Sequence, residues 1–572
     1  MPAIEFNRYY RYDELTQLLR EYEREFPNLI QIESIGKSYE GRDIWLATLT
    51  NQRTGAAADK PAFWCDGNIH ASEVSASTAV LYLIHSLCSK YGADATITRA
   101  LDSRAFFLVP RLNPDGAEWS LEEPPRVVRS STRPYPFDED DPYGLERKDL
   151  DGDGRILNIR VKDPNGPWKI AEEEPRMLKR REPGETGGTY YRVFPEGLFH
   201  HFDRLTMRPR KIKEGLDMNR NWPSAWRYES EQRGAGEFPT SEPEIHSAVS
   251  AIVRRPNICG AVTFHTFSGV HLRPPSRKPD DELPAEDLWA YQKIGEMGME
   301  MTGYPAISNY HEFRYHPKEV ITGVFDDWMY EHRGVYAWTT EIWSPQRQAG
   351  ITDYKYIDWF REHPFEHDLM MLKWSDEKLG GKGYVDWYEF DHPQLGKVEI
   401  GGWDSHYAFR NPPPDFLEAE VAPLSDWVIW QALASPKLEL RECRVEPISP
   451  GSPGQRFRIR FAVQNTGWLP TSVTKLADEK KLCRGVVGEI ALHGEPLEGE
   501  GRDEPDWLIS GKLREERGQL TGWSHVSPSG FGWQANATDD VALFEWVVGP
   551  GTYDLVAKHE RAGVVRHRVE VG

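Results

Sequence analysis

The stretch AFWCDGNIHASE at residues 62–73 joins a short apolar run to a histidine and a glutamate. The apolar run predicts a buried strand, and the apolar spacing over 73–90 predicts a helix that opens at Glu73. A strand followed closely by a helix places the connecting residues at the carboxyl edge of a sheet, where open α/β proteins bind their ligands. We therefore expect His70 and Glu73 to face a cleft.

The rest of the first two-thirds of the chain repeats this alternation of strands and helices. Residues 29–50 alternate as two strands, and helical patterns cover 241–254 and 285–302. Further short apolar runs lie at 105–109, 260–264 and 335–339. Buried strands interleaved with helices predict an α/β fold, in which helices flank a mixed sheet.

Two changes in composition and apolar pattern divide the chain of 572 residues. Residues 131–216 are dense in charge, proline and glycine and are interpreted as an insertion within a first domain at 1–375. Residues 436–572 alternate on a two-residue period between turn signals, which predicts a smaller all-β sandwich. Residues 376–435 lie between them, and we expect a connector packed on the first domain.

Composition excludes several classes of protein. The 69 basic and 90 acidic residues give a net charge of −21, which argues against a nucleic-acid partner. The five cysteines are scattered and never form a CxxC pair, so neither a disulfide framework nor a thiolate metal cluster is expected. We find no secretory signal pattern and no apolar run long enough for a membrane span, and we therefore expect a cytoplasmic protein.

A metal site is predicted from His70, Glu73 and a third residue. A histidine and a carboxylate three residues apart can converge on one ion, and a zinc site then needs one more nitrogen ligand. His265 supplies that ligand at the end of another predicted strand, in GAVTFHTFSG at 260–269. The expected cofactor is one Zn²⁺ per chain.

The chain contains two other HxxE patterns, at His316 and His363. His363-Pro364-Phe365-Glu366-His367 matches a zincin motif in which both histidines project from one continuous helix. Pro364 fits only the first turn of a helix, so His363 would lie before the helical face that two ligands must share. His316 precedes a proline in loop-like sequence, and neither pattern is expected to bind metal.

With these residues in place, the sequence resembles the zinc metallocarboxypeptidases of the carboxypeptidase A/B type. The resemblance is carried in chain order by GNIHASE at 67–73, NPDG at 113–116, DMNRNW at 217–222, FPTSEPE at 238–244, FHTFSG at 264–269 and TTEIW at 339–343. It spans roughly residues 6–375. The fold it implies is the carboxypeptidase-like α/β domain, and the activity is hydrolysis of the C-terminal peptide bond of a peptide.

The resemblance assigns roles to the remaining polar residues of these motifs. Glu341 closes the predicted strand VYAWTTE and would act as the general base and acid. Asn219 and Arg220 would hold the carboxylate of the substrate, since arginine binds carboxylates bidentately. Arg129 would stabilise the oxyanion, although Arg126 and Arg133 lie close enough in sequence to take that role.

The sequence departs from the family pattern at two places. Ser72 stands where the carboxypeptidase A-like enzymes carry an arginine that helps bind substrate. The mobile tyrosine of the family has no counterpart in KEVIT at 318–322, so Tyr310, Tyr315 or neither replaces it. Asp326 matches the acid of carboxypeptidase B-like members, which implies a preference for a basic or diamino C-terminal residue; its alternative role is to cap a helix.

Two further features are open to more than one interpretation. Asp149, Asp151 and Asp153 fit the first half of a calcium loop, but the twelfth position is Arg160, so the alternative is a plain acidic turn. QNTGWLPTSVT at 464–474 resembles the immunoglobulin-like accessory domain of bacterial metallocarboxypeptidases.

Two alternatives to a peptidase remain at this point. An N-acyl amino-acid deacylase of the related fold would share HxxE and a distant histidine, although NPDG and FPTSEPE favour the peptidase. An inactive cell-wall-binding scaffold would have no reason to keep a carboxylate such as Glu341 buried.

Overall fold

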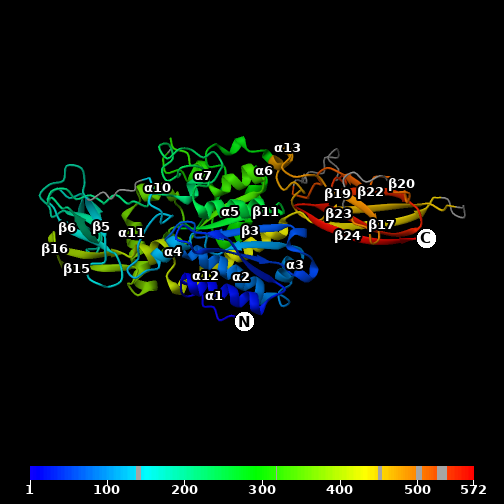
Figure 1. Ribbon diagram of the computed structural model, residues 1–572. Coiled ribbons are helices and arrows are strands. Elements are labelled where there is room, and N and C mark those ends of the chain that lie inside the picture. Colours follow the sequence, from blue (N-terminus) through cyan, green and yellow to red (C-terminus); the bar gives the residue numbers. More distant parts are fainter. Residues whose placement is uncertain (137–142, 317, 449–453, 498–504, 525–536) are drawn as a thin grey trace.

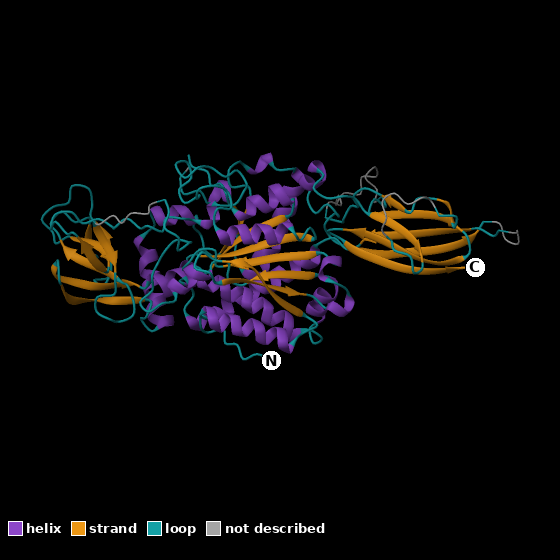
Figure 2. Cartoon of the chain, viewed as in Figure 1, coloured by secondary structure: helices purple, strands orange, loops and turns teal. Residues whose placement is uncertain are grey.

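The molecule consists of three parts arranged in a row (Figure 1). The computed structural model describes residues 1–136, 143–316, 318–448, 454–497, 505–524 and 537–572. A central domain of helices and strands lies between a smaller β module, formed mainly by the insertion and the connector, and the C-terminal β domain (Figure 2).

An eight-stranded mixed sheet forms the centre of the middle domain. Its inner strands β4, β3, β11 and β14 run parallel, whereas β1, β2 and β12 join by antiparallel pairing. In sheet order the strands are β1 (Ile30–Lys37), β2 (Asp43–Leu49), β4 (Ala105–Val109), β3 (Ala62–Gly67), β11 (Ile258–Thr266), β14 (Tyr336–Ile342), β12 (Val270–Arg273) and β13 (Ala306–Ser308). The predicted α/β class with a mixed sheet is confirmed.

Helices cover this sheet and account for the long apolar patterns. Helix α2 is apolar almost all round because it packs on β3 and β11 and is itself covered by α12. Helix α12 also contacts α6, which ties the end of the predicted connector to the central domain. The main helices are α1 (Tyr12–Glu25), α2 (Val74–Lys90), α3 (Ala95–Ser103), α4 (Pro114–Ser120), α5 (Pro243–Val253), α6 (Ala285–Thr302), α8 (Phe325–Trp328), α10 (Tyr356–Arg361), α11 (Phe365–Leu379) and α12 (Pro414–Ala434).

The structure divides the predicted connector at 376–435 differently. Its hairpin, β15 (Tyr384–His392) and β16 (Gly396–Trp403), does not join the central sheet but pairs with strand β6 of the insertion. The cause is a small shared core, in which Val398 and Ile400 pack against Leu157 and Ile159. The boundary predicted at 375 also falls inside α11.

Insertion and hairpin together form the smaller β module. Its six-stranded sheet has the order β15, β16, β6 (Asn158–Lys162), β9 (Tyr191–Pro195), β7 (Trp168–Ile170) and β8 (Leu178–Arg180). A separate two-stranded sheet joins β5 (Gly144–Arg147) to β10 (Gly197–His200).

The C-terminal domain contains two four-stranded sheets that share one core. Phe461 and Phe544 of the first sheet pack with Leu555 and Ala557 of the second, as expected for a sandwich. The first sheet has β17 (Leu438–Pro447), β18 (Phe457–Asn465), β22 (Val541–Val548) and β20 (Leu508–Ser510); the second has β21 (Arg514–Glu516), β19 (Val487–Leu492), β23 (Gly551–His559) and β24 (Gly563–Val571).

A buried carboxylate joins this domain to the central one. Asp287 on α6 accepts hydrogen bonds from the backbone amides of Lys475 and Leu476, which begin helix α13 (Lys475–Lys480), and from the hydroxyls of Tyr330 and Tyr336. Within the part of the chain that the structure describes, no helix combines the length and the apolar character that a membrane crossing requires.

Candidate metal centre and cleft

Three neighbouring parallel strands deliver the predicted metal ligands and the predicted base to one edge of the sheet. His265 on β11 lies directly opposite Glu341 on β14 in the register of the two strands. Gly67, the last residue of β3, pairs with Phe264, so the turn that follows β3 brings His70 to the same edge. Glu73 is the N-cap of α2, directly after this turn.

The structure brings His70, Glu73 and His265 within bonding distance of one another. The Nδ1 atoms of the two histidines lie 3.1 Å apart. Glu73 Oε1 lies 2.9 Å from His70 Nδ1, and Glu73 Oε2 lies 3.2 Å from His265 Nδ1. Ligands about 2.0–2.2 Å from a tetrahedral zinc ion stand about 3.3 Å from each other, so the three donors fit the edges of such a site.

Burying these charged and polar side chains costs free energy unless a cation is bound between them. Side-chain exposure is 3% for His70, 2% for Glu73 and 1% for His265. Burial alone would raise the pKa of Glu73, but the two adjacent imidazoles lower it well below its usual range. A buried carboxylate that faces two ring nitrogens is the donor set of catalytic zinc sites.

Asp217 belongs to this site although the sequence reasoning did not single it out. Its Oδ1 lies 3.0 Å from His70 Nε2, the ring nitrogen that faces away from Glu73. A carboxylate in this position fixes the tautomer and orientation of a metal-binding histidine. The available signal was the position of Asp217 at the start of DMNRNW, two residues before the predicted Asn219.

Of the three arginines considered for the oxyanion role, the structure places Arg129 at the site. Arg129 Nε donates to Asp217 Oδ2 at 3.0 Å, and its Nη1 lies 3.4 Å from Glu73 Oε1. Arg133 instead forms a bidentate pair with the buried Glu242. Arg126 pairs with Glu122 and stacks on a tryptophan ring outside the site.

Glu341 lines the cleft next to the ligand cluster. Its Oε2 is buried and accepts no hydrogen bond within the described part of the chain. Burial and repulsion by Glu73 raise the pKa of Glu341 well above its usual range, against smaller lowering effects of Arg129 and Arg410. An unpartnered carboxylate with a raised pKa is suited to accept and release a proton.

The predicted carboxylate anchor lies on the loop that follows the insertion. Asn219 Oδ1 accepts a hydrogen bond from the amide of Phe325, and the Arg220 guanidinium donates to the carbonyl of Asn219 at 2.7 Å. Gly323, at φ +68°, packs so closely that a Cβ there would lie 2.2 Å from the Arg220 carbonyl oxygen. The segment at 323–325 therefore packs closely against the backbone that carries Arg220.

Asp326 is almost completely buried close to this anchor. Its Oδ2 accepts a hydrogen bond of 2.7 Å from Asn309 Nδ2, and burial raises its pKa to about 6. The adjacent Asp327 accepts hydrogen bonds from Ser276 instead.

The cleft beside the ligands is a cavity of about 350 Å³ with aromatic walls. Phe267, Phe313, Tyr315 and Tyr356 line it together with Glu73, Arg129 and Glu341. Of the two tyrosines considered from the sequence, Tyr315 reaches the cleft, whereas Tyr310 packs against His311 and Arg314.

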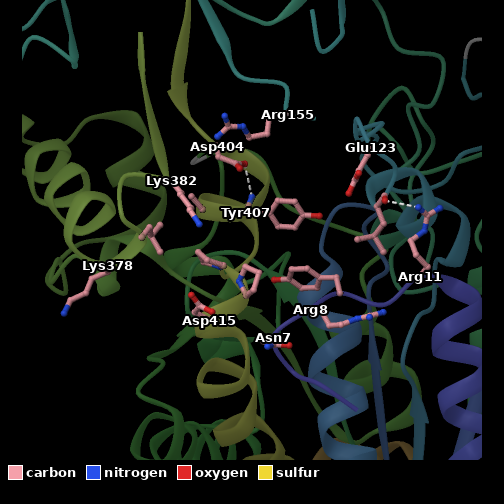
Figure 3. A pocket seen from close by; sticks show the side chains of 17 residues that line it. Asn7, Arg8, Arg11, Glu123, Arg155, Lys378, Lys382, Asp404, Tyr407 and Asp415 are labelled. Carbon is pink, nitrogen blue, oxygen red and sulfur yellow. Dashed lines mark hydrogen bonds between the residues drawn. The ribbon is translucent and has the colours of Figure 1, made fainter. Parts of the chain in front are cut away.

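A larger cavity, about 940 Å³, lies elsewhere (Figure 3). Its walls come from the N-terminal segment, the insertion and the connector, and include Arg8, Arg155 and Tyr407. None of the three ligands, nor Glu341, lines it. The volume of a cavity therefore does not identify the reactive site. The buried set of metal-binding side chains identifies it.

The other sequence patterns that were weighed as metal sites lie outside this cluster. His363 stacks on Trp359 and bonds Asp368, and helix α11 begins after Pro364 as expected. The carboxylates of Asp149, Asp151 and Asp153 lie near one another but already accept hydrogen bonds from backbone amides of their own loop. Calcium binding there remains a prediction.

Comparisons with known proteins identify the family of the chain. The zinc carboxypeptidase family profile matches residues 15–363, and a domain of unknown function, DUF8731, matches residues 437–570. Carboxypeptidase B of Astacus astacus is 30% identical over 171 residues, which are 30% of this chain and 48% of that protein. The chain thus spans about half the length of this relative.

The chain is also similar to an inactive relative and to a solved structure. The inactive metallocarboxypeptidase ECM14 of Saccharomyces cerevisiae is 31% identical over 129 residues, which are 22% of this chain and 30% of that protein. The crystal structure of carboxypeptidase A from Helicoverpa armigera covers 75% of this chain and 74% of its own, with 17% identity and a TM-score of 0.41. With a family profile matching more than half of its residues, the chain belongs to the zinc carboxypeptidase family.

Proposed function

We propose that this metallocarboxypeptidase is an exopeptidase that removes the C-terminal residue of peptides. The observation that carries the proposal is the pairing of a buried His70–Glu73–His265 donor set with the unpartnered carboxylate of Glu341 across two adjacent strands. An inactive scaffold would have no need for a desolvated carboxylate beside such a centre.

Each residue has a distinct task in this proposal. A zinc ion held by His70, Glu73 and His265 would polarise the scissile carbonyl and lower the pKa of water. Glu341 accepts the proton of the attacking water and passes it to the leaving amine, which its raised pKa favours. Arg129 donates hydrogen bonds to the oxygen on which negative charge develops.

Substrate positioning is the task of the loop at 217–222. Arg220 and Asn219 hold the free C-terminal carboxylate of the peptide, and a planar guanidinium does so with two parallel hydrogen bonds. Tyr315 closes over the bound residue from the cleft wall.

The proposed preference for a basic or diamino C-terminal residue depends on Asp326 alone. A cationic side chain that reached this carboxylate would replace the hydrogen bond from Asn309 and lower its raised pKa. The matched test is Asp326→Asn, which should lower kcat/KM for peptides that end in lysine or arginine and leave peptides with apolar ends unchanged.

A library assay separates this proposal from its alternatives. The zinc-loaded protein is incubated with peptides of defined C-terminal residue and with N-acyl amino acids, and the products are identified by mass spectrometry. Release of single C-terminal residues supports the peptidase. Cleavage of N-acyl amino acids alone identifies a deacylase, and no product from either set identifies an inactive relative.

A further inference from the structure

One positively charged residue of the cleft lies outside the region that matches the family profile. Arg410 ends the π-helical turn η6 (Ser405–Arg410), beyond residues 15–363 that match the family. It lines the 350 Å³ cavity together with Glu341 and Phe267, and its guanidinium lies 5.9 Å from the centre of the Phe267 ring.

The backbone at Arg410 is fixed to the turn that carries the metal ligands. The next residue, Asn411, is fully buried; its Nδ2 donates to the carbonyl of Ser72 at 2.8 Å. Its Oδ1 accepts from the amide and the hydroxyl of Ser75. At the other end of η6, Asp404 caps the turn, as Figure 3 shows for its bond to Tyr407. The backbone that carries Arg410 is therefore fixed at the cleft.

The positive charge of Arg410 is also not neutralised by an ion pair within the described residues. Within the described residues the Arg410 side chain makes no hydrogen bond and no ion pair, and its guanidinium lies near the Phe267 ring. The other arginines of the cleft differ, since Arg129 binds Asp217 and Arg361 binds Asp358. The one carboxylate of the cleft outside the ligand set is Glu341, which the proposed reaction needs as a free base.

A second guanidinium from the insertion adds to this charge. Arg147 ends strand β5, and within the described residues it too has no ion pair. Burial lowers the pKa of Arg147, and the nearby charge of Arg410 lowers it further. An unneutralised guanidinium binds an anion with planar, bidentate geometry.

We propose that Arg410 is a specificity-determining residue that binds a carboxylate on the amino side of the scissile bond, so that the enzyme selects substrates with an acidic residue there. The proposal rests on the proposed function, in which Arg220 holds the C-terminal carboxylate. Arg220 does not line the cavity that Arg410 shares with Glu341. In the proposed function the peptide runs from Arg220 past Glu341, and its residues before the scissile bond then reach the part of the cavity lined by Phe267 and Arg410.

The test compares paired peptides that share one C-terminal residue and carry either glutamate or glutamine at one of the two positions before it. For the zinc-loaded wild-type chain we expect kcat/KM to be about tenfold or more higher for a glutamate peptide, as for a charged hydrogen bond. Arg410→Gln should reduce this ratio to about one, while the glutamine peptide is still cleaved. Arg410→Glu should reverse the preference towards a lysine peptide.

Three results decide the matter. A glutamate-to-glutamine ratio that depends on Arg410, together with the reversal in Arg410→Glu, supports the proposal. Equal kcat/KM for both peptides in the wild type, or a ratio that survives both variants, overturns it while leaving the peptidase intact. Absence of release from every peptide by zinc-loaded wild type refutes the proposed function itself and the inference with it. Arg441→Gln, an exposed arginine on β17, is the control for loss of one positive charge.

Discussion

The bond between Asp217 and His70 predicts a measurable loss of metal affinity when it is broken. In Asp217→Asn the side chain keeps its shape but has one acceptor oxygen instead of two. That oxygen can accept a hydrogen bond from either His70 Nε2 or Arg129 Nε but not from both. In the wild type each of these nitrogens lies 3.0 Å from a carboxylate oxygen of Asp217. The amide group then presents a donor to the remaining partner, and the guanidinium loses its counter-charge.

The magnitude follows from the role of the lost bond. Removing a partner that orients a metal-bound histidine typically weakens metal binding by about 10–100-fold, which is roughly 1.4–2.7 kcal/mol. The burial of Asp217, whose side chain is 12% exposed, places the expected effect in the upper half of this range. Because Arg129 is disturbed at the same time, kcat/KM should fall further than zinc occupancy explains.

The assay is a competition titration of the zinc-loaded protein with a chelator of known affinity, with far-ultraviolet circular dichroism to show that the fold is kept. Asp281→Asn, an exposed residue outside the site, removes the same charge and is the matched control. Zinc affinity of Asp217→Asn within about twofold of the control would refute the reasoning.

Two further predictions concern backbone packing and pH. Gly323→Ala should lower kcat/KM by about tenfold or more, because its Cβ would displace the carbonyl of Arg220; Gly303→Ala, at a similar φ of +75° but with open space around it, is the control and should keep its activity. Steady-state kinetics with one peptide checks both variants, and equal losses would contradict the packing argument. Burial lowers the pKa of His271 to about 3, so its neutral form stabilises the fold above pH 6.5 and this contribution is lost as the pH falls. By pH 5 this loss amounts to about 2 kcal/mol of the free energy of unfolding. Urea unfolding should therefore show a smaller decrease in the free energy of unfolding between pH 7 and pH 5 for His271→Asn than for the wild type. An equal decrease in both proteins would contradict the prediction.

The elements that carry the site could be predicted from the sequence because their signals are local. The apolar run at 62–65 and the helical pattern at 73–90 became β3 and α2, with His70 and Glu73 between them. Parallel strands end at one edge of a sheet, so His265 could be grouped with them although it lies 195 residues away.

Other features depend on partners that no local pattern identifies. The hairpin at 384–403 alternates like any strand pair, and nothing in it specifies that β16 pairs with β6, more than 200 residues earlier. Asp217 stood inside a recognised motif, but its bond to His70 depends on the loop conformation. Arg410 lies outside every motif, and only the three-dimensional structure brings it to the cleft.

The measurement that tests the account most directly combines zinc content with the activity of Glu341→Gln. Wild type and variant are prepared together, their zinc is quantified, and release of C-terminal residues is measured on the best peptide of the library. We predict one zinc per chain in both proteins and a loss of about 10²–10⁴-fold in kcat for the variant, since Glu341 contacts the reacting groups but is not a ligand. Zinc bound at one per chain, with no peptide release that depends on Glu341, would contradict the account.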